Sequence, residues 1–387
     1  YNAPNGPLDF VIMDGVGIGT HYESDCFAQA NTPNLDWLKN NSFYTEIKAH
    51  GKAVGLPDDT DMGNSEVGHN AIGCGRVFDQ GAALIDQAIT SGMLYKGKVW
   101  NDLIKNVEDN QSTLHMIGLL SDGKVHSNIC HLESMLLEAK HRRIKKIRIH
   151  ALIDGRDVPP LSALEYVKRI ENFLSEINSD EYFDYRIASG GGRMKITMDR
   201  YDADWPMIEK GWNTHVLGKG RFFNSMSQAI TILRSEKKGI LDQDLPPFVI
   251  HENEKAIGPI KDGDSVILFN YRGDRALEIT KAFEADVLSE FDRGEKPKVF
   301  YAGMMQYDGD LGIPENFLVS PPAIDKTMSE YLSNSNVSQY AISETQKYGH
   351  VTYFFNGNNS SKFETETWVE IPSDNSLLMK NQECKPI

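Results

Sequence analysis

Residues 146–157 read KIRIHALIDGRD and join an isoleucine-rich run to a polar cluster. The apolar run, 146–153, is followed at once by Asp154, Gly155, Arg156 and Asp157. A short apolar run bounded by turn residues is typical of a buried β-strand. We therefore predict a strand over 146–153 whose carboxyl end opens into a polar loop.

The same arrangement recurs along the chain. Apolar runs lead into polar clusters at 113–120 (SDG follows), 186–188 (SGGGR follows), 265–269 (NYR follows) and 8–13, which leads into Asp14 and GVGIG. Strands alternating with polar loops and helices indicate an α/β fold with mainly parallel sheets flanked by helices. In such sheets ligands bind beyond the carboxyl ends of the strands, where all these clusters fall.

Composition excludes several function classes. The chain has 387 residues and a formal net charge of −15, which argues against binding nucleic acid or an anionic membrane surface. It has no apolar stretch of about 18 residues, the length that a membrane-spanning helix needs. Its four cysteines are scattered without CxxC spacing, which favours a reducing compartment. We expect a cytoplasmic protein.

Residues 61–70, DMGNSEVGHN, are the most informative for function. Ser65 follows a Gly-Asn turn at the start of a predicted helix, where backbone N–H groups and the helix dipole favour an anion. A serine there is well placed to hold a phosphoryl group. The alternative is that Ser65 or Asn64 only caps the helix, with Glu66 in its first turn.

Two motifs are candidates for metal binding. Asp14 follows the apolar run 8–13 directly, so its carboxylate can reach a metal in the crevice. The glycines after it imitate a dinucleotide site, but their spacing is GxGxG rather than GxGxxG. Asp122 and His126 have DxxxH spacing, although the glycine between them favours a loop over the helix face that such ligands need.

Arginines gather on the predicted loops. Guanidinium groups bind phosphate and carboxylate through paired donors, whereas a single arginine more often forms a surface salt bridge. Several of them beside glycine or aspartate at strand ends indicate a site for a small polyanion. His126 is a further candidate acid, base or phosphate donor. The arginines are Arg156, Arg193, Arg200, Arg272 and Arg275.

Together these blocks resemble the cofactor-independent (2,3-bisphosphoglycerate-independent) phosphoglycerate mutases of the alkaline-phosphatase-like superfamily. The resemblance covers nearly the whole chain in the family's order. Its motifs are MDGVGIG, AHGKAVGLP, DMGNSEVGHN, IGLLSDGKVHS, HALIDGRDVP, IASGGGRMKITMDRY, FNYRGDR, SETQKYGHVTYFFNGN and EIPSD.

The resemblance implies a mechanism. Ser65 would be the nucleophile that takes the phosphoryl group from 3-phosphoglycerate, and the glycerate would reorient and take it back on its 2-hydroxyl. Asp14 and Ser65 would ligate metal in a site for two divalent ions, with manganese expected and magnesium or cobalt as alternatives. No 2,3-bisphosphoglycerate would be needed. The implied partner is the small-molecule substrate phosphoglycerate, and the protein would be a monomer.

It also implies binding residues and domains. The glycerate would be held by His126, Arg156, Asp157, Arg193 and Arg200, and the phosphate by Arg272, Arg275 and Lys347. A phosphatase-like domain would comprise 1–79 and 318–387, with a transferase domain at 80–317 inserted into it. We expect hinges at Gln80-Gly81 and at Ser320-Pro321-Pro322.

The sequence departs from the family pattern at its end. The family continues beyond EIPSD with blocks rich in aspartate and histidine, whereas no histidine follows His350 here. Most of the family's metal ligands are therefore missing, and we expect a fragment of a longer mutase. The alternatives are a catalytically inactive phosphoglycerate-binding fragment and a related metal-dependent phosphomutase or phosphatase.

Overall fold

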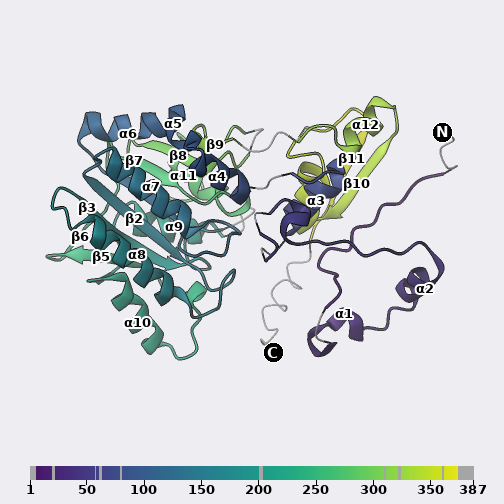
Figure 1. Cartoon of the computed structure of the whole chain (residues 1–387), viewed down its shortest axis with the longest axis horizontal. Helices are drawn as coiled ribbons and strands as arrows, with labels where there is room; N and C mark the ends of the chain where they lie inside the picture. Colours follow the sequence, from purple (N-terminus) through teal and green to yellow (C-terminus); the bar gives the residue numbers. More distant parts are fainter. Residues whose placement is uncertain are drawn as a thin grey trace.

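The computed structural model describes residues 6–19, 22–56, 58–60, 63–78, 81–199, 204–308, 311–320, 324–359 and 361–373. Within these ranges the chain forms a large sheet wrapped in helices and a separate two-stranded sheet. In Figure 1 the large sheet and its helices lie on the left, and the small sheet lies on the right with α3 (Ser65–Cys74) and α12 (Met328–Asn334).

The large sheet confirms the predicted fold class. Neighbouring strands are parallel except β3–β5 and β5–β6, which are antiparallel. The run 146–153 forms a strand over those same residues. In spatial order the strands are β4 (Arg221–Phe223), β5 (Phe248–Glu252), β3 (Asp184–Gly192), β2 (Lys146–Ile153), β1 (Leu114–Leu119), β7 (Ser265–Leu268), β8 (Phe300–Met305) and β9 (Phe317–Val319), with β6 (Lys255–Ala256) beside β5.

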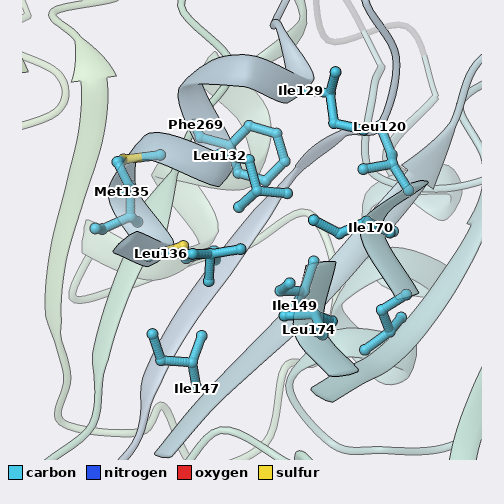
Figure 2. Packing of buried hydrophobic residues seen from close by; sticks show 14 of the residues in the cluster. Leu120, Ile129, Leu132, Met135, Leu136, Ile147, Ile149, Ile170, Leu174 and Phe269 are labelled. Carbon is cyan, nitrogen blue, oxygen red and sulfur yellow. The ribbon is translucent and has the colours of Figure 1, made fainter. Parts of the chain in front are cut away.

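Helices cover both faces of this sheet because its strands present apolar side chains on both sides. Ile147 and Ile149 of β2 pack into one hydrophobic cluster, whereas Ile117 of β1 packs into the other. Figure 2 shows the first cluster, in which Leu132 and Leu136 approach the sheet from one helix and Ile170 from the next. The first face is covered by α6 (Lys98–Asn110), α7 (Ile129–His141), α8 (Ala163–Ile177) and α10 (Met226–Glu236), and the second by α9 (Trp205–His215) and α11 (Leu277–Glu284).

The small sheet pairs β10 (Gln339–Glu344) with β11 (Glu366–Ile371) in parallel. After β10 the chain continues through α13 (Thr345–Gly349) into a π-helical turn, His350–Phe354, which packs on α3. The approach is close: a Cβ on Gly73 of α3 would lie 2.0 Å from the Phe355 carbonyl oxygen. Glycine at this position therefore lets α3 lie against the residues that follow β10.

The remaining helices are short or lie outside the main layers, and α4 (Gly81–Thr90) and α5 (Met93–Lys96) contribute Ile85 and Leu94 to the first hydrophobic cluster. Thr32 is the N-cap residue of α2 and Pro33 its first residue, as the Thr-Pro pair predicts. The other elements are α1 (Cys26–Gln29), α2 (Pro33–Asn41) and the 3-10 turns Tyr22–Ser24, Gly51–Val54, Asp242–Asp244 and Gly273–Arg275. No helix in the described residues is long and apolar enough to cross a membrane.

The prediction of a strand over 8–13 is wrong. Those residues form no regular element, and Leu8 and Val11 are 86% and 76% exposed. A strand needs a neighbour for its backbone hydrogen bonds, and no described strand runs beside this segment. Of the predicted hinge residues, Gly81 begins α4, whereas Gln80, Pro321 and Pro322 lie outside the described residues.

Candidate active site

Ser65 is the first residue of α3, and its neighbour caps the helix. The Asn64 side chain accepts a hydrogen bond from the backbone N–H of Val67 at 3.1 Å. Asn64 therefore takes the capping role that the sequence left open between it and Ser65. The Ser65 hydroxyl is available for other partners at the positive end of the helix dipole.

Those partners come from distant parts of the chain. The Ser65 Oγ donates to Asp14 Oδ2 at 2.5 Å, and the Lys347 Nζ donates to the same Oγ at 3.3 Å. Lys347 and Asp14 also form an ion pair. The His69 Nδ1 lies 3.3 Å from the Ser65 Oγ and 2.7 Å from the Ser65 carbonyl oxygen. A carboxylate, an ammonium and an imidazole thus surround one hydroxyl.

The surroundings fix the charges of these groups. Partial burial raises the pKa of Asp14, but hydrogen bonds from Lys347 and Ser65 outweigh it and lower that pKa to about 2. Burial lowers the pKa of His69, and it lowers the pKa of His350 to about 3 with help from the nearby Lys347 charge. At neutral pH Asp14 is therefore a carboxylate and both imidazoles are neutral.

These residues supply only part of the ligands that a metal ion needs. Asp14 and Ser65 offer two oxygens of the kind that divalent ions bind. Within the part of the chain that the structure describes, no group of three or more His, Cys, Asp and Glu side chains could hold a metal. Protein metal sites commonly use about three or four side chains, so the described residues do not complete such a site.

A second cluster lies at the carboxyl ends of the large sheet and is organised by Asp154. This buried carboxylate accepts from the backbone N–H groups of Gly155, Arg156 and Asp157 at 2.9, 3.1 and 3.1 Å. It also accepts from the Ser121 hydroxyl at 2.6 Å. Asp154 therefore shapes the loop after β2 and ties it to the loop after β1. The sequence reasoning did not assign it a role, although an aspartate before Gly-Arg-Asp at a strand end was a usable signal.

Arg193, at the end of β3, completes this cluster. It is only 1% exposed, and its Nη1 donates to Asp154 Oδ1 at 3.0 Å and to Asp157 Oδ2 at 2.5 Å. Burial raises the pKa of Asp157, and this effect outweighs the opposing attraction of Arg193. The Arg156 side chain is exposed beside this cluster, and Arg200 lies outside the described residues.

Arg272 joins the serine helix to the large sheet. Its Nε lies 3.4 Å from Glu66 Oε2 in the first turn of α3 and 3.2 Å from Asp274 Oδ1. The Asp274 Oδ1 lies in turn 3.8 Å from the Nδ1 of His126. The sequence reasoning missed the pairing roles of Glu66 and Asp274, which only their proximity reveals. A chain of charged groups thus runs from the residue after Ser65 to His126.

A cavity of about 330 Å³ lies along this junction. Both units line it, with Asn64 and Glu66 on one side and Lys124, Arg272 and Asp274 on the other. Arg275 follows Arg272 closely in the sequence, and its Nη1 donates to the Met198 carbonyl at 2.6 Å. The cavity brings the cationic side chains of Lys124 and Arg272 to the start of the helix that carries Ser65, where carboxylates of Glu66, Asp274 and Asp308 also line it. Arg272 can bind an anion there through paired donors.

Comparisons with known proteins show which family the chain resembles. A family described as "BPG-independent PGAM N-terminus (iPGM_N)" matches residues 85–309. The chain is 54% identical over 381 residues to a probable 2,3-bisphosphoglycerate-independent phosphoglycerate mutase of Leptospira interrogans, covering 97% of this chain and 69% of that protein. It is 50% identical to the mutase of that name from Trypanosoma brucei brucei, covering 98% of this chain and 70% of the relative.

A solved structure is similar over the same extent. It is described as Leishmania mexicana phosphoglycerate mutase at low cobalt concentration. The TM-score is 0.89 at 50% sequence identity, and the match covers 94% of this chain and 67% of that one. The chain therefore belongs to the 2,3-bisphosphoglycerate-independent phosphoglycerate mutase family.

Proposed function

We propose that this protein interconverts 3-phosphoglycerate and 2-phosphoglycerate through a phosphoserine on Ser65. The observation that carries the proposal is the position of the Ser65 Oγ, which contacts both Asp14 and Lys347 at the start of α3. Its helix faces a cavity that Lys124 and Arg272 also line. The serine hydroxyl, its acceptor Asp14 and the Lys347 ammonium therefore lie at the start of a helix whose residues Asn64 and Glu66 line this cavity.

In the first half-reaction the Ser65 Oγ forms a bond to phosphorus and the bond from phosphorus to the 3-oxygen breaks. The Ser65 proton is released and the 3-oxygen of glycerate gains one, so charge and protons balance. Asp14 orients the hydroxyl by accepting its hydrogen bond. The Lys347 ammonium stabilises the negative charge that develops on Oγ and on the transferring group.

The second half-reaction reverses the first with a different hydroxyl. The 2-oxygen of glycerate bonds to phosphorus, the bond from phosphorus to Ser65 Oγ breaks, and the 2-hydroxyl proton is released as Ser65 regains one. Glycerate must stay bound between the steps. We assign that role to His126, Arg156, Asp157, Arg193 and Arg200, and phosphate binding to Arg272, Arg275 and Lys347.

Further parts of the proposal come from family membership. Asp14 and Ser65 would supply two of the oxygens for two divalent ions, which would stabilise charge on the transferring group, with manganese as the expected metal. Residues 1–79 and 318–387 form the phosphatase-like domain, and 80–317 form the inserted transferase domain. The protein is a cytoplasmic monomer. Cobalt, named for the similar Leishmania protein, is an alternative metal.

The test is turnover of 3-phosphoglycerate by wild type, Ser65→Ala and a control, Ser91→Ala. Ser91 is an exposed serine just after α4, and within the described residues its hydroxyl forms hydrogen bonds only with residues close to it in the chain. We expect Ser65→Ala alone to lose turnover and to lose acid-stable label from phosphorus-labelled substrate. Turnover retained in Ser65→Ala contradicts the proposal. Binding without turnover in the metal-loaded wild type supports the inactive binding protein, and faster turnover of a phosphopentose supports a related phosphomutase.

A further inference from the structure

Three histidines form a continuous hydrogen-bonded chain inside the large sheet, away from Ser65. His115 lies in β1, His150 in β2 and His215 in α9, and their exposed fractions are 1%, 0% and 1%. The His115 Nδ1 is 2.9 Å from the His150 Nε2. Ser189 of β3 links the next pair, because its Oγ lies 2.7 Å from His150 Nδ1 and 2.7 Å from His215 Nδ1.

Each end of the chain has a fixed partner. At one end the His115 Nε2 lies 3.1 Å from Oδ2 of Asp264, a carboxylate that also accepts backbone N–H groups. At the other end the His215 Nε2 lies 3.1 Å from the Oγ1 of Thr197. The network therefore runs from a carboxylate at the start of β7 to the segment that follows β3.

The carboxylate sets the direction of every bond. Asp264 can only accept, so His115 donates through Nε2 and accepts through Nδ1. His150 then donates through Nε2 and accepts from the Ser189 hydroxyl. The Ser189 oxygen accepts from His215 Nδ1, which leaves the His215 Nε2 to accept from the Thr197 hydroxyl. Every histidine is neutral in this arrangement, which agrees with burial lowering the pKa of all three.

Thr197 has a backbone conformation that needs such support. Its φ is +68°, in the left-handed region that β-branched residues rarely adopt. Helix α9 holds it in two further ways: the Thr197 N–H donates to the Met207 carbonyl at 3.1 Å, and Gly211 leaves space for its hydroxyl. A Cβ on Gly211 would lie 2.2 Å from the Thr197 Oγ1.

The segment fixed in this way carries one candidate substrate residue, Arg193, and leads into the residue that holds a second, Arg275. His215 contacts Ser189 and Thr197 together, so it closes the segment 189–197, in which Arg193 is the buried arginine. The residue after Thr197 is Met198, whose carbonyl accepts from Arg275 at 2.6 Å. A displacement of Thr197 would therefore shift the positions of both Arg193 and Arg275.

We propose that this chain, ending at His215 and Thr197, is a positioning device that holds Arg193 and Arg275 in place for the phosphoglycerate anion. Thr197, Ser189 and His215 are positioning residues, because they act through the segment that carries Arg193 and through the Met198 carbonyl that accepts from Arg275. The inference rests on the proposed function. It requires that removing the Thr197 hydroxyl lowers the affinity for substrate by more than the accompanying loss in the free energy of unfolding explains.

The test compares Thr197→Val, which keeps the shape but removes the hydroxyl, with Thr197→Ser, which keeps the hydroxyl. The control is Thr280→Val in α11, a buried threonine whose Oγ1 donates to the Ala276 carbonyl and contacts the Tyr301 hydroxyl. Calorimetry measures 3-phosphoglycerate binding, and urea unfolding measures stability. We expect Thr197→Val to bind about 10-fold more weakly, the effect of one hydrogen bond of about 1.4 kcal/mol. Thr197→Ser should restore most of the affinity, and Thr280→Val should bind like wild type.

Wild-type affinity in a folded Thr197→Val protein overturns the inference and leaves the proposed function intact. Equal losses in Thr197→Val and Thr280→Val overturn it as well, because they indicate a general loss of stability. If Thr197→Val does not fold, Ser189→Ala breaks the next link and carries the same expectation. Wild-type protein that neither binds nor turns over phosphoglycerate contradicts the proposed function instead.

Discussion

The ammonium of Lys347 lies 3.3 Å from the hydroxyl oxygen of Ser65, although 282 residues separate them in the chain. The contact exists because the turn after β10 packs on the helix that Ser65 begins. Asp14 pairs with both residues and so brings a third distant segment to the same point. The chemistry of the site therefore depends on how three segments are assembled.

Replacing Lys347 with methionine should lower kcat for 3-phosphoglycerate by about 100-fold, because a preorganised charge at the reacting oxygen is lost. It should also raise the pKa of Asp14 from about 2 toward its ordinary value, since Lys347 supplies the main lowering interaction. Steady-state kinetics and carboxyl NMR titration measure the two effects. Lys347→Arg keeps the charge and should lose less activity. An unchanged kcat in Lys347→Met contradicts the assignment.

Replacing Arg272 should weaken substrate binding. Arg272→Met removes a cation from the cavity and leaves the Asp274 carboxylate beside it without its partner, so the site attracts an anionic substrate less strongly. We expect KM to rise by about 10-fold or more, the effect of losing a charge-assisted contact of about 1.5–3 kcal/mol. Arg221→Met is the control, since Arg221 pairs with Glu236 on the surface. Equal KM values for the two variants would reject the role of Arg272.

Asp154→Asn should destabilise the protein by about 3–5 kcal/mol. The change removes one charge of a buried pair and leaves Arg193 with only Asp157. It also weakens the acceptor for three backbone N–H groups of the loop after β2. Urea unfolding measures the loss. Asp109→Asn, which breaks an exposed pair with Lys105, should leave the stability almost unchanged. Similar losses for the two variants would show that Asp154 does not organise the loop.

Lowering the pH should reduce the free energy of unfolding through the buried histidines. Burial lowers the pKa of His215 to about 3, whereas histidine in an unfolded chain titrates near 6.5. Between these values the unfolded state binds a proton that the folded state does not, so stability falls as pH falls below about 6.5. Urea unfolding at about pH 7.5 and about pH 5 checks the sign. His215→Phe should flatten the dependence, whereas the exposed His141→Gln should not. A steeper dependence in His215→Phe contradicts this account.

The amino-acid sequence by itself determined the parallel α/β class and the strand over 146–153, because hydrophobic runs and turn residues act locally. It also placed the clusters after β1, β2 and β7 at strand ends, since the ends of parallel strands share one edge of a sheet, whereas Ser189–Gly192 proved to belong to β3 itself. Only the tertiary structure showed that 8–13 is not a strand, because a strand depends on a partner rather than on its own composition. It alone decided that Lys347 meets Ser65 and that Arg193 is buried between two aspartates, because contacts between distant residues follow from packing and not from local pattern.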